Sequence, residues 1–398
     1  MSPKVLHLST YGAGGGAARA AAALHRAMEA EGVQSTLTTA QGGRFRLARE
    51  LDRQLWRLQR SPVVTWRSPA RFGSLTAETI NRSDADIVNL HWVTNGFLSI
   101  ESIGRITKPV VWSLYDMWTF CGTEHYGVDA PDARWRQGYL RSNRLAGETG
   151  IDIDRLAWQR KCKSWSPMHV VPASTWLTTA TGQSALMHDW PITKIPHVID
   201  TAAFAPQDMR DTRMRLGLPE AAPLVLFLAS AGIDDKRKGF DLLEAALPAV
   251  RESHPNVEVV VVGPITTGYE SPTGVPIHWY GSVSGDEALR DLYTACNVTA
   301  APSREDNMPL TAMEAQTCGR AVVAFDIGGL PDIVSHHETG YLAPEGNVES
   351  LAAGLTQAIN DSLGMSAWGV AARERALVTW SPHHVVSQYL DLYESVLR

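Results

Sequence analysis

One loop in the second half of the chain combines acidic and amide side chains with the start of a predicted helix. Glu305, Asp306 and Asn307 follow an apolar run, and Pro309 is a residue type suited to a first helical turn. Backbone amides at a helix start, aided by the helix dipole, bind anions such as a diphosphate. Glu314 lies eight positions after Asp306, so both carboxylates could face one ligand. The pattern predicts a site for a phosphorylated ligand; the alternative is that these acids only cap the helix and face solvent.

A second loop carries three consecutive cations, Lys236, Arg237 and Lys238, between an apolar run at 223–230 and a stretch of helical period at 238–253. A basic loop that follows a strand and precedes a helix lies where the crevice of an α/β sheet collects phosphate groups. On its own, a Lys-Arg-Lys run is more often a solvated surface turn. Together with the acidic loop, it predicts a cationic wall for the same anion.

The elements that would position these loops follow an alternating pattern. Short runs rich in Val, Ile and Leu are followed by longer stretches of helical period, which is typical of βαβ units around a parallel sheet. Strands are expected at 4–9, 33–39, 86–92, 109–114, 168–172, 223–230, 257–263, 277–281, 297–303 and 320–325. Helices are expected at 17–31, 238–253, 285–295, 309–318 and 348–360, with one long irregular region at 117–165. The pattern predicts a doubly wound α/β arrangement in each half of the chain.

Length and proline content predict two domains. At roughly 100 to 200 residues per domain, 398 residues favour two compact cores. The proline-rich segment 189–208 has little helical period, so we place the hinge inside it. We expect one domain at 1–195, a second at 196–375, and a closing helix within 376–398 that packs back on the first domain.

Composition excludes several classes of protein. A net charge of −6 and a pI near 6.1 argue against nucleic acid as the main partner. The four cysteines show no CxxC or Cys/His spacing, which argues against a disulfide framework and against structural zinc. The N-terminus lacks a signal-peptide pattern, and no window approaches about 18 uninterrupted apolar residues. We expect a cytoplasmic protein.

A glycine loop, with Gly14, Gly15 and Gly16, follows the first predicted strand and precedes a helix. Glycines there let the backbone approach a ligand closely. The spacing does not match a dinucleotide fingerprint, and no acid follows the second predicted strand, which argues against a nicotinamide dehydrogenase. Asp84 and Asp86 form an Asp-x-Asp sequence but precede their strand, away from the ligand edge of a sheet, so we expect no metal site.

The stretch 301–334 resembles the acidic motif of glycosyltransferase family 4, the retaining enzymes of GT-B fold, in which two acids at this spacing bracket the donor. The resemblance is strongest from 223 to 345, and it implies an α/β GT-B fold of two Rossmann-like, doubly wound domains that face each other across a cleft. It implies that Glu314 grips the ribose hydroxyls, while Asp306 or its neighbour Glu305 contacts the donor sugar. The donor-binding residues that it implies in this loop are Glu305, Asp306, Asn307, Met308, Pro309, Leu310 and Glu314.

The same resemblance gives roles to other loops of the donor side. Lys238 matches the basic residue that neutralises the diphosphate leaving group, with Lys236 or Arg237 as the second cation. The loop after Gly281 would frame the nucleotide base through its backbone, and the glycine loop would lie under the donor phosphates. These two loops contribute Ser282, Val283, Gly15 and Gly16 to the implied donor site.

The segments 84–92 and 110–126 resemble the acceptor side of a polysaccharide-assembling branch of the family. That branch commonly has His-Asp where this chain has Tyr115-Asp116. The acceptor-side candidates are His91, Tyr115, Asp116 and His125.

The resemblance therefore implies a metal-independent, retaining hexosyltransferase with no cofactor, with acceptor binding in 1–195, nucleotide-sugar binding in 196–375, and Asp306, Lys238 and Asp116 as catalytic residues. The donor would be a UDP-sugar or, as a second choice, a GDP-sugar. The acceptor would be a hydroxyl of a saccharide, a lipid-linked compound or a small molecule, in exopolysaccharide or antigen biosynthesis. The alternatives are a nucleotide-sugar epimerase on the same fold and a non-catalytic nucleotide-sugar-binding protein.

The segment 43–73 carries eight arginines against two acids, with leucines at near-helical spacing. A basic amphipathic helix can rest on anionic lipid at the inner face of the membrane. It can equally cover the protein core while its arginines face water, which is the commoner case.

Overall fold

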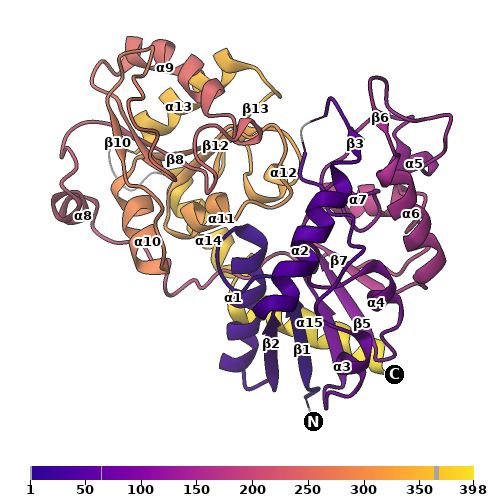
Figure 1. Ribbon diagram of the computed structural model, residues 1–398. Coiled ribbons are helices and arrows are strands. Elements are labelled where there is room, and N and C mark those ends of the chain that lie inside the picture. The colour runs from indigo at the N-terminus through magenta and orange to yellow at the C-terminus, as the bar shows by residue number, and fades with distance from the viewer. Residues whose placement is uncertain (1, 64, 363–366) are drawn as a thin grey trace. The chain divides into compact units, whose positions relative to one another are not determined.

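The computed structural model describes residues 2–63, 65–362 and 367–398. Contacts divide the chain into two compact units: unit 1 comprises Met1–Pro196 with Val386–Arg398, and unit 2 comprises His197–Val385. Each unit has its own parallel sheet and its own hydrophobic core, and Figure 1 labels most of the elements of both.

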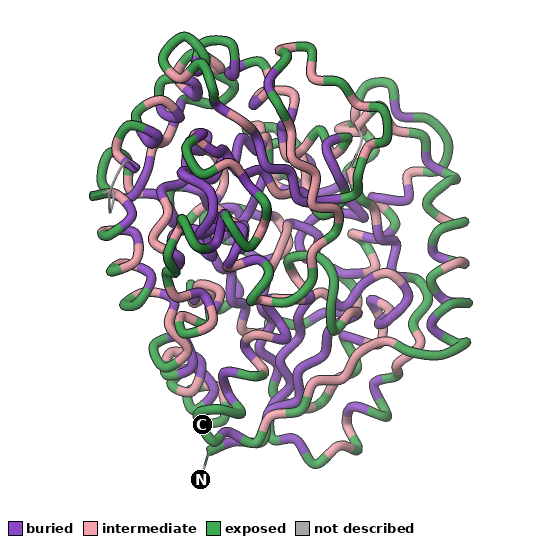
Figure 2. The backbone as a smooth tube through the Cα atoms, turned by 90° about the vertical axis from the view of Figure 1, so that its left-hand side faces the viewer, coloured by how far each residue is buried: buried purple, intermediate pink, exposed green. Residues whose placement is uncertain are grey.

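Unit 1 is built on five parallel strands in the order β2-β1-β4-β5-β7. They are β1 (Val5–Ser9), β2 (Ser35–Thr39), β4 (Ile87–Leu90), β5 (Val110–Leu114) and β7 (His169–Pro172). Every residue of β1, β4 and β5 is buried, whereas β2 at the sheet edge is only partly covered. Figure 2 shows the same contrast in general: buried stretches follow the strands, and surface helices alternate between buried and exposed residues.

The helices of unit 1 differ in length and in how they start. Serine and threonine caps begin several of them, as at Thr76, Ser99 and Ser174, where the side chain accepts from an amide of the first turn. The helices are α1 (Gly16–Ala30), α2 (Gly42–Trp56), α3 (Ala77–Asn81), α4 (Ile100–Gly104), α5 (Arg134–Gln137), α6 (Ile153–Ser164) and α7 (Thr175–Gln183).

The C-terminal helix α15 (Pro382–Leu397) belongs to unit 1 from Val386 onward. Asn89 of β4 donates to the Tyr393 hydroxyl at 2.7 Å, and the hydroxyls of Ser113 and Tyr389 lie 2.9 Å apart. Two buried tyrosines thus bring the end of the chain to the middle of the first sheet.

Two expectations for unit 1 are wrong in part. The region 117–165 is not irregular throughout, because it contains α5 and α6 and a short strand, β6 (Thr149–Gly150), which pairs with β3 (Gln59–Arg60). Ion pairs hold this region: the Arg67 guanidinium contacts the Asp154 carboxylate, and Arg134 lies 2.7 Å from Asp152. The basic segment 43–73 is helical only as far as Trp56, where α2 ends.

Unit 2 has six parallel strands in the order β10-β9-β8-β11-β12-β13. They are β8 (Leu224–Leu228), β9 (Glu258–Val262), β10 (Ile277–Trp279), β11 (Val298–Ala301), β12 (Ala321–Phe325) and β13 (Gly340–Ala343). The helices are α8 (Met209–Leu216), α9 (Phe240–Ser253), α10 (Asp286–Ala295), α11 (Leu310–Thr317), α12 (Leu330–Ile333), α13 (Val348–Asp361) and α14 (Ala367–Thr379), with a 3-10 turn, η1 (Lys236–Lys238), before α9.

Strand order reverses once in each sheet. In unit 1 the chain runs outward from β1 to β2 and then returns to β4 on the other side of β1. In unit 2 it runs from β8 through β9 and β10 and then returns to β11 beside β8. Ligands of open α/β sheets bind at the carboxyl ends of the strands at such reversal points. The loops after β1 and β4, and after β8 and β11, are therefore the places to look for a site.

Candidate active site

In unit 2, the loops after β8 and β11 are tied to each other through their backbones. The Arg304 amide donates to the Arg237 carbonyl at 2.8 Å, and the Arg304 guanidinium lies 2.9 Å from the Asp241 carboxylate. Gly239 adopts φ 73°, and a Cβ on it would collide with the Pro302 carbonyl oxygen. A glycine is needed there because it combines a left-handed conformation with a close backbone approach.

Lys238 and Asp306, both predicted site residues, form an ion pair at the meeting point of these loops. The Lys238 Nζ lies 2.5 Å from Asp306 Oδ2, and the Arg237 guanidinium lies 3.6 Å from the same oxygen. Burial raises the pKa of Asp306, but the two cations outweigh it and hold that pKa below its usual value. The sequence left open which of two acids takes part; in the structure Asp306 is the buried one, and the Glu305 side chain is exposed.

His197 lies within electrostatic reach of Asp306, although sequence reasoning did not single it out. Burial lowers the pKa of His197 to about 4, and the Asp306 charge opposes that shift. The imidazole is therefore neutral at neutral pH. Its position inside the proline-rich segment 189–208, far from any glycine loop or acidic motif in the sequence, left no signal for it.

The backbone that leads from Asp306 into α11 is closely packed. A Cβ on Gly328 would collide with the Asp306 carbonyl oxygen, and the Gly329 amide donates to that oxygen at 3.1 Å. Asn307, Met308 and Leu310 have buried side chains, and Pro309 is the cap residue of α11, in agreement with the expected helix start. Packing on both sides holds this loop in one conformation.

Glu314 lies in α11 with 1% of its surface exposed. Its Oε2 accepts a hydrogen bond of 2.8 Å from the hydroxyl of Tyr293, which belongs to α10. The carboxylate is thus held in one orientation inside unit 2. Ser282 and Val283 lie in the loop between β10 and α10, and Ser282 is exposed.

In unit 1, the glycine loop after β1 is open. Gly14 and Gly15 adopt φ values of 75° and 72°, and Gly15 precedes the first residue of α1, Gly16. A Cβ on any of the three would meet no atom within 4 Å. The exposed start of a 15-residue helix with no acid in its first turn suits an anion.

The four acceptor-side candidates of unit 1 line one small hollow. Asp116 Oδ2 lies 2.6 Å from His125 Nδ1, and His91 Nδ1 lies 2.9 Å from the Tyr115 hydroxyl. The structure therefore brings together His91, Tyr115, Asp116 and His125, which come from the ends of β4 and β5 and the loop after them. Burial raises the pKa of the Tyr115 hydroxyl well above its ordinary value.

Three further side chains take part in this cluster and were not predicted. The Trp92 indole N–H donates to Asp116 at 2.9 Å, the Ser68 hydroxyl lies 2.8 Å from His125 Nε2, and His7 Nδ1 lies 2.8 Å from His91 Nε2. Burial, together with His91 and His25, lowers the pKa of His7 well below its usual value. The sequence holds a weak signal for Trp92, which directly follows His91.

Lys161 of α6 holds the loop that connects Asp116 to His125. Its buried ammonium group donates to the carbonyls of Trp118, Cys121 and Gly122, and it lies 3.8 Å from the centre of the Trp118 ring. Burial lowers the pKa of Lys161 to about 7. Sequence reasoning missed Lys161 because it treated 117–165 as irregular.

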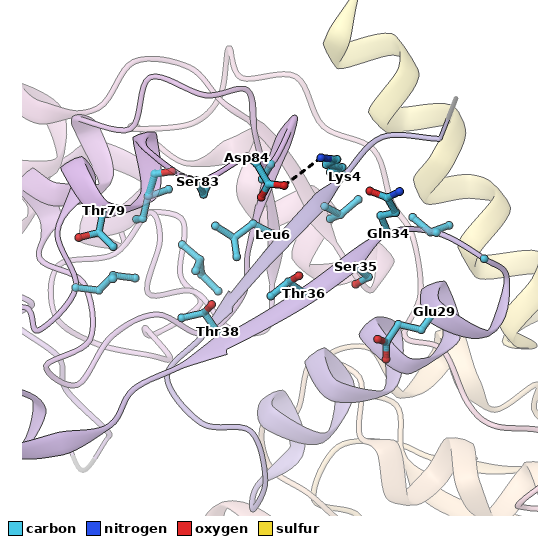
Figure 3. Close-up of a pocket in the computed structure, with 17 residues that line it drawn as sticks. Lys4, Leu6, Glu29, Gln34, Ser35, Thr36, Thr38, Thr79, Ser83 and Asp84 are labelled. Carbon is cyan, nitrogen blue, oxygen red and sulfur yellow. Dashed lines mark hydrogen bonds and ion pairs between the residues drawn. The ribbon is translucent and has the colours of Figure 1, made fainter.

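A separate cavity of about 700 Å³ lies at the edge of the first sheet, and Figure 3 shows its lining. Leu6 of β1 and Thr36 and Thr38 of β2 form one wall of the cavity. At one side, the Lys4 Nζ and the Asp84 carboxylate form an ion pair of 3.0 Å. None of the predicted site residues lines this cavity. It lies apart from the loops at the reversal point and has no evident place in the chemistry.

Among the residues that the structure describes, no group of three or more His, Cys, Asp and Glu side chains could hold a metal ion. Over the same residues, no helix has the length and apolar character that a membrane span requires.

Comparison with known proteins gives consistent results for the sequence and the structure. Residues 208–375 match the family described as glycosyl transferases group 1. D-inositol 3-phosphate glycosyltransferase of Nocardiopsis dassonvillei is 27% identical over 361 residues, which cover 85% of this chain and 77% of that protein.

Several solved structures resemble the whole chain, among them the following two. Anabaena HepE, crystallised with UDP-glucose, aligns with a TM-score of 0.66 at 18% identity over 99% of this chain and all of its own. Sucrose-phosphate synthase from Thermosynechococcus elongatus aligns with a TM-score of 0.68 at 18% identity over 99% of each chain. The chain therefore has the GT-B fold, and its residues 208–375 match the glycosyl transferases group 1 family.

Proposed function

We propose that this protein is a retaining hexosyltransferase of glycosyltransferase family 4 that uses a nucleotide diphosphate sugar, a UDP-sugar in preference to a GDP-sugar. The observation that carries the proposal is the contact of Lys238 and Arg237 with Asp306 at the strand reversal point of unit 2. The match to a glycosyltransferase family over this part of the chain supports it, as does the likeness to a protein crystallised with UDP-glucose.

In this proposal the cations of unit 2 receive the diphosphate. Asp306 holds the Lys238 ammonium group in place before the donor binds, and Arg237, which donates to the Glu305 carbonyl at 2.9 Å, flanks it. Lys238 then stabilises the charge that develops on the diphosphate as the bond to the sugar breaks. Because cationic side chains and backbone amides supply this stabilisation, the reaction needs no divalent metal or cofactor, and EDTA should leave turnover unchanged.

The remaining donor contacts are those that the family resemblance implies. Glu314, oriented by Tyr293, binds the ribose hydroxyls, and the backbone at Ser282 and Val283 frames the base. Gly15 and Gly16 at the open start of α1 contribute amides to the phosphates. Asp306 lies nearest the sugar, and the acceptor hydroxyl attacks the anomeric carbon from the face that the diphosphate leaves.

The acceptor is a saccharide or a lipid-linked compound, bound beside Asp116 and His125 of unit 1. The pair, separated by 2.6 Å, presents one carboxylate among aromatic and imidazole groups, which suits a sugar hydroxyl. Tyr115 occupies the place of the usual histidine and contacts His91 instead of an acid. We place the reaction in the cytoplasm, in exopolysaccharide or antigen assembly.

A thermal-shift panel of nucleotide sugars tests the donor site. Binding to the native state raises stability by about 2.7 kcal/mol at a ligand concentration of 100 Kd. The UDP-sugar that binds should give a rise in Tm, and Glu314→Ala should remove that rise. Glu252→Ala, an exposed acid of the same unit, is the matched control and should keep it.

The outcome of turnover assays with that donor decides between the proposal and its alternatives. Transfer to an added saccharide or lipid-linked acceptor supports the proposal. Conversion of the donor sugar without an acceptor would indicate an epimerase, and tight binding without any turnover would indicate a non-catalytic binding protein. If no nucleotide sugar shifts the Tm, the donor site is wrongly assigned.

A further inference from the structure

Helix α2 is attached to unit 1 by one narrow stripe of residues. Phe45, Ala48 and Asp52 are buried, and the Phe45 ring lies 6.2 Å from the Tyr11 ring. The Asp52 carboxylate accepts from the amides of Arg71 and Phe72 at 3.0 and 3.2 Å. These contacts set the rotation of α2 about its own axis.

That rotation turns an aliphatic face of α2 toward solvent. Leu47, Leu51 and Leu58 are 62%, 40% and 48% exposed, and their spacing places them along one side of the helix and of the turn that ends it. We call these three residues the α2 ridge. A row of exposed leucines on a helix that is already docked by another face marks a surface for a partner.

The surroundings of the α2 ridge are strongly basic, although the chain as a whole has a net charge of −6. Between Gly43 and Arg60 the only acids are Glu50 and the buried Asp52. The exposed arginines of this stretch are Arg44, Arg46, Arg49, Arg53, Arg57 and Arg60. Trp56, at the end of α2, is 37% exposed.

We infer that α2 lies on an anionic lipid surface, with the α2 ridge among the acyl chains and the arginines on lipid phosphates. An anionic bilayer suits both the leucines and the arginines of this surface. The leucines can enter the hydrocarbon region, and the guanidinium groups can bind the phosphates of the headgroups. Tryptophan is also enriched at the boundary between the two. A second copy of this chain would bring the same arginines together, so charge favours the membrane over a dimer.

The position of α2 connects this surface to the acceptor side, a step that rests on the proposed function. Phe45 contacts Tyr11, the Tyr11 ring stacks 6.0 Å from Trp92, and Trp92 donates to Asp116. A membrane on the α2 ridge would therefore be connected to Asp116 through α2 and three aromatic side chains of the same unit. This connection favours a lipid-linked acceptor over a free saccharide.

Vesicle sedimentation of the full chain tests the surface. The wild type should sediment with vesicles of phosphatidylglycerol and phosphatidylcholine at low salt, and far less with phosphatidylcholine alone. Binding should fall in 1 M salt, where the Debye length shrinks to about 3 Å from about 10 Å at 0.1 M. The double change Leu47→Gln with Leu51→Gln should weaken binding by about tenfold or more, since two leucines no longer enter the acyl chains.

Matched controls separate this surface from general effects. Val378→Gln removes an exposed apolar residue of unit 2, 71% exposed, and should leave sedimentation unchanged. Arg46→Glu with Arg57→Glu should abolish binding to anionic vesicles, whereas Arg82→Glu, an exposed arginine after α3, should not. All variants should keep the wild-type Tm, because none of these side chains is buried.

Three results would overturn the inference: no sedimentation of the wild type, ridge variants that bind like the wild type, or a wild-type dimer in light scattering that the ridge variants split. The donor thermal shift, measured in parallel, keeps the two proposals distinct. Vesicle binding without any donor shift would defeat the proposed function and leave the surface in place. A donor shift without vesicle binding would defeat the surface alone.

Discussion

The loops after β8 and β11 of unit 2 and the loops after β4 and β5 of unit 1 are built in different ways. In unit 2, charged side chains contact one another directly, and short backbone links through Gly239 and Arg304 hold the two loops together. In unit 1, one carboxylate, Asp116, lies among histidines and tryptophans, and a buried lysine from a distant helix holds its loop.

Under the proposed function, this difference matches two different tasks. A diphosphate carries several charges and a constant shape, so a compact set of cations and amides can recognise it. An acceptor presents mainly neutral hydroxyl groups, which require aromatic surfaces and a few directed hydrogen bonds. The two regions should therefore respond differently to substitution, and the following predictions are ordered by expected size.

Lys238→Ala should lower kcat by roughly 10²–10³-fold, because the leaving diphosphate loses the group that stabilises its charge. Steady-state kinetics with the donor found in the thermal-shift panel would measure this. Arg210→Ala, an exposed arginine of the same unit, serves as the control and should leave kcat unchanged. A Lys238→Ala enzyme with near wild-type kcat would show that the cationic loop does not serve the reaction.

Asp116→Asn should lower kcat/KM for the acceptor by about 10- to 100-fold, the size expected when a hydrogen bond to a charged group is lost. The donor-induced Tm shift should stay the same, since Asp116 belongs to unit 1 and contacts Trp92 and His125. A loss of donor binding in this variant would break the division of tasks between the two regions.

Lys161→Met should reduce the free energy of unfolding by about 3 kcal/mol, because three buried carbonyls lose their donor at ~1 kcal/mol or more each. Urea denaturation followed by tryptophan fluorescence would report the change. Lys163→Met alters an exposed lysine of the same helix and should have little effect. Equal stability of the two variants would show that the Lys161 contacts do not support the loop.

Asp52→Asn should change how stability depends on pH. Burial raises the pKa of Asp52 to about 6, so between about pH 4 and pH 6 the folded protein holds more protons than the unfolded chain. In the wild type, the contribution of Asp52 to the free energy of unfolding is therefore greatest below pH 4. This contribution falls by about 1 to 3 kcal/mol as the pH rises through 6. Asn keeps an acceptor for the two amides without titrating, so the variant should lack this fall in Tm scans across the range.

Much of the fold could be read from the sequence because strands buried on both faces are short apolar runs. The ten strands expected from such runs correspond to ten of the eleven strands in the two main sheets. The missing one, β13, is four residues long, begins with Gly340 and is only half buried in its centre, so it shows no apolar run. The helix α6 was missed because its apolar positions are few and its buried Lys161 reads as a surface residue.

The residues of the candidate site also differ in whether the sequence could predict them. Lys238 and Asp306 could be linked from sequence because each follows a strand, and parallel strands end at one edge of the sheet. His197, Ser68 and Lys161 could not, because each reaches the site region from a segment whose position depends on tertiary packing.

The sequence by itself determined the alternation of strands and helices, the glycines that permit close backbone approach, and the loops that carry charge. Only the tertiary structure decided that Asp306 and not Glu305 contacts Lys238, that Asp116 pairs with His125, and that the leucines of α2 face solvent. The physical reason is that the local sequence governs which segments form helices or strands and how their apolar residues are spaced. Which side chains share a buried space depends on contacts between distant segments, and these form only when the sheets assemble.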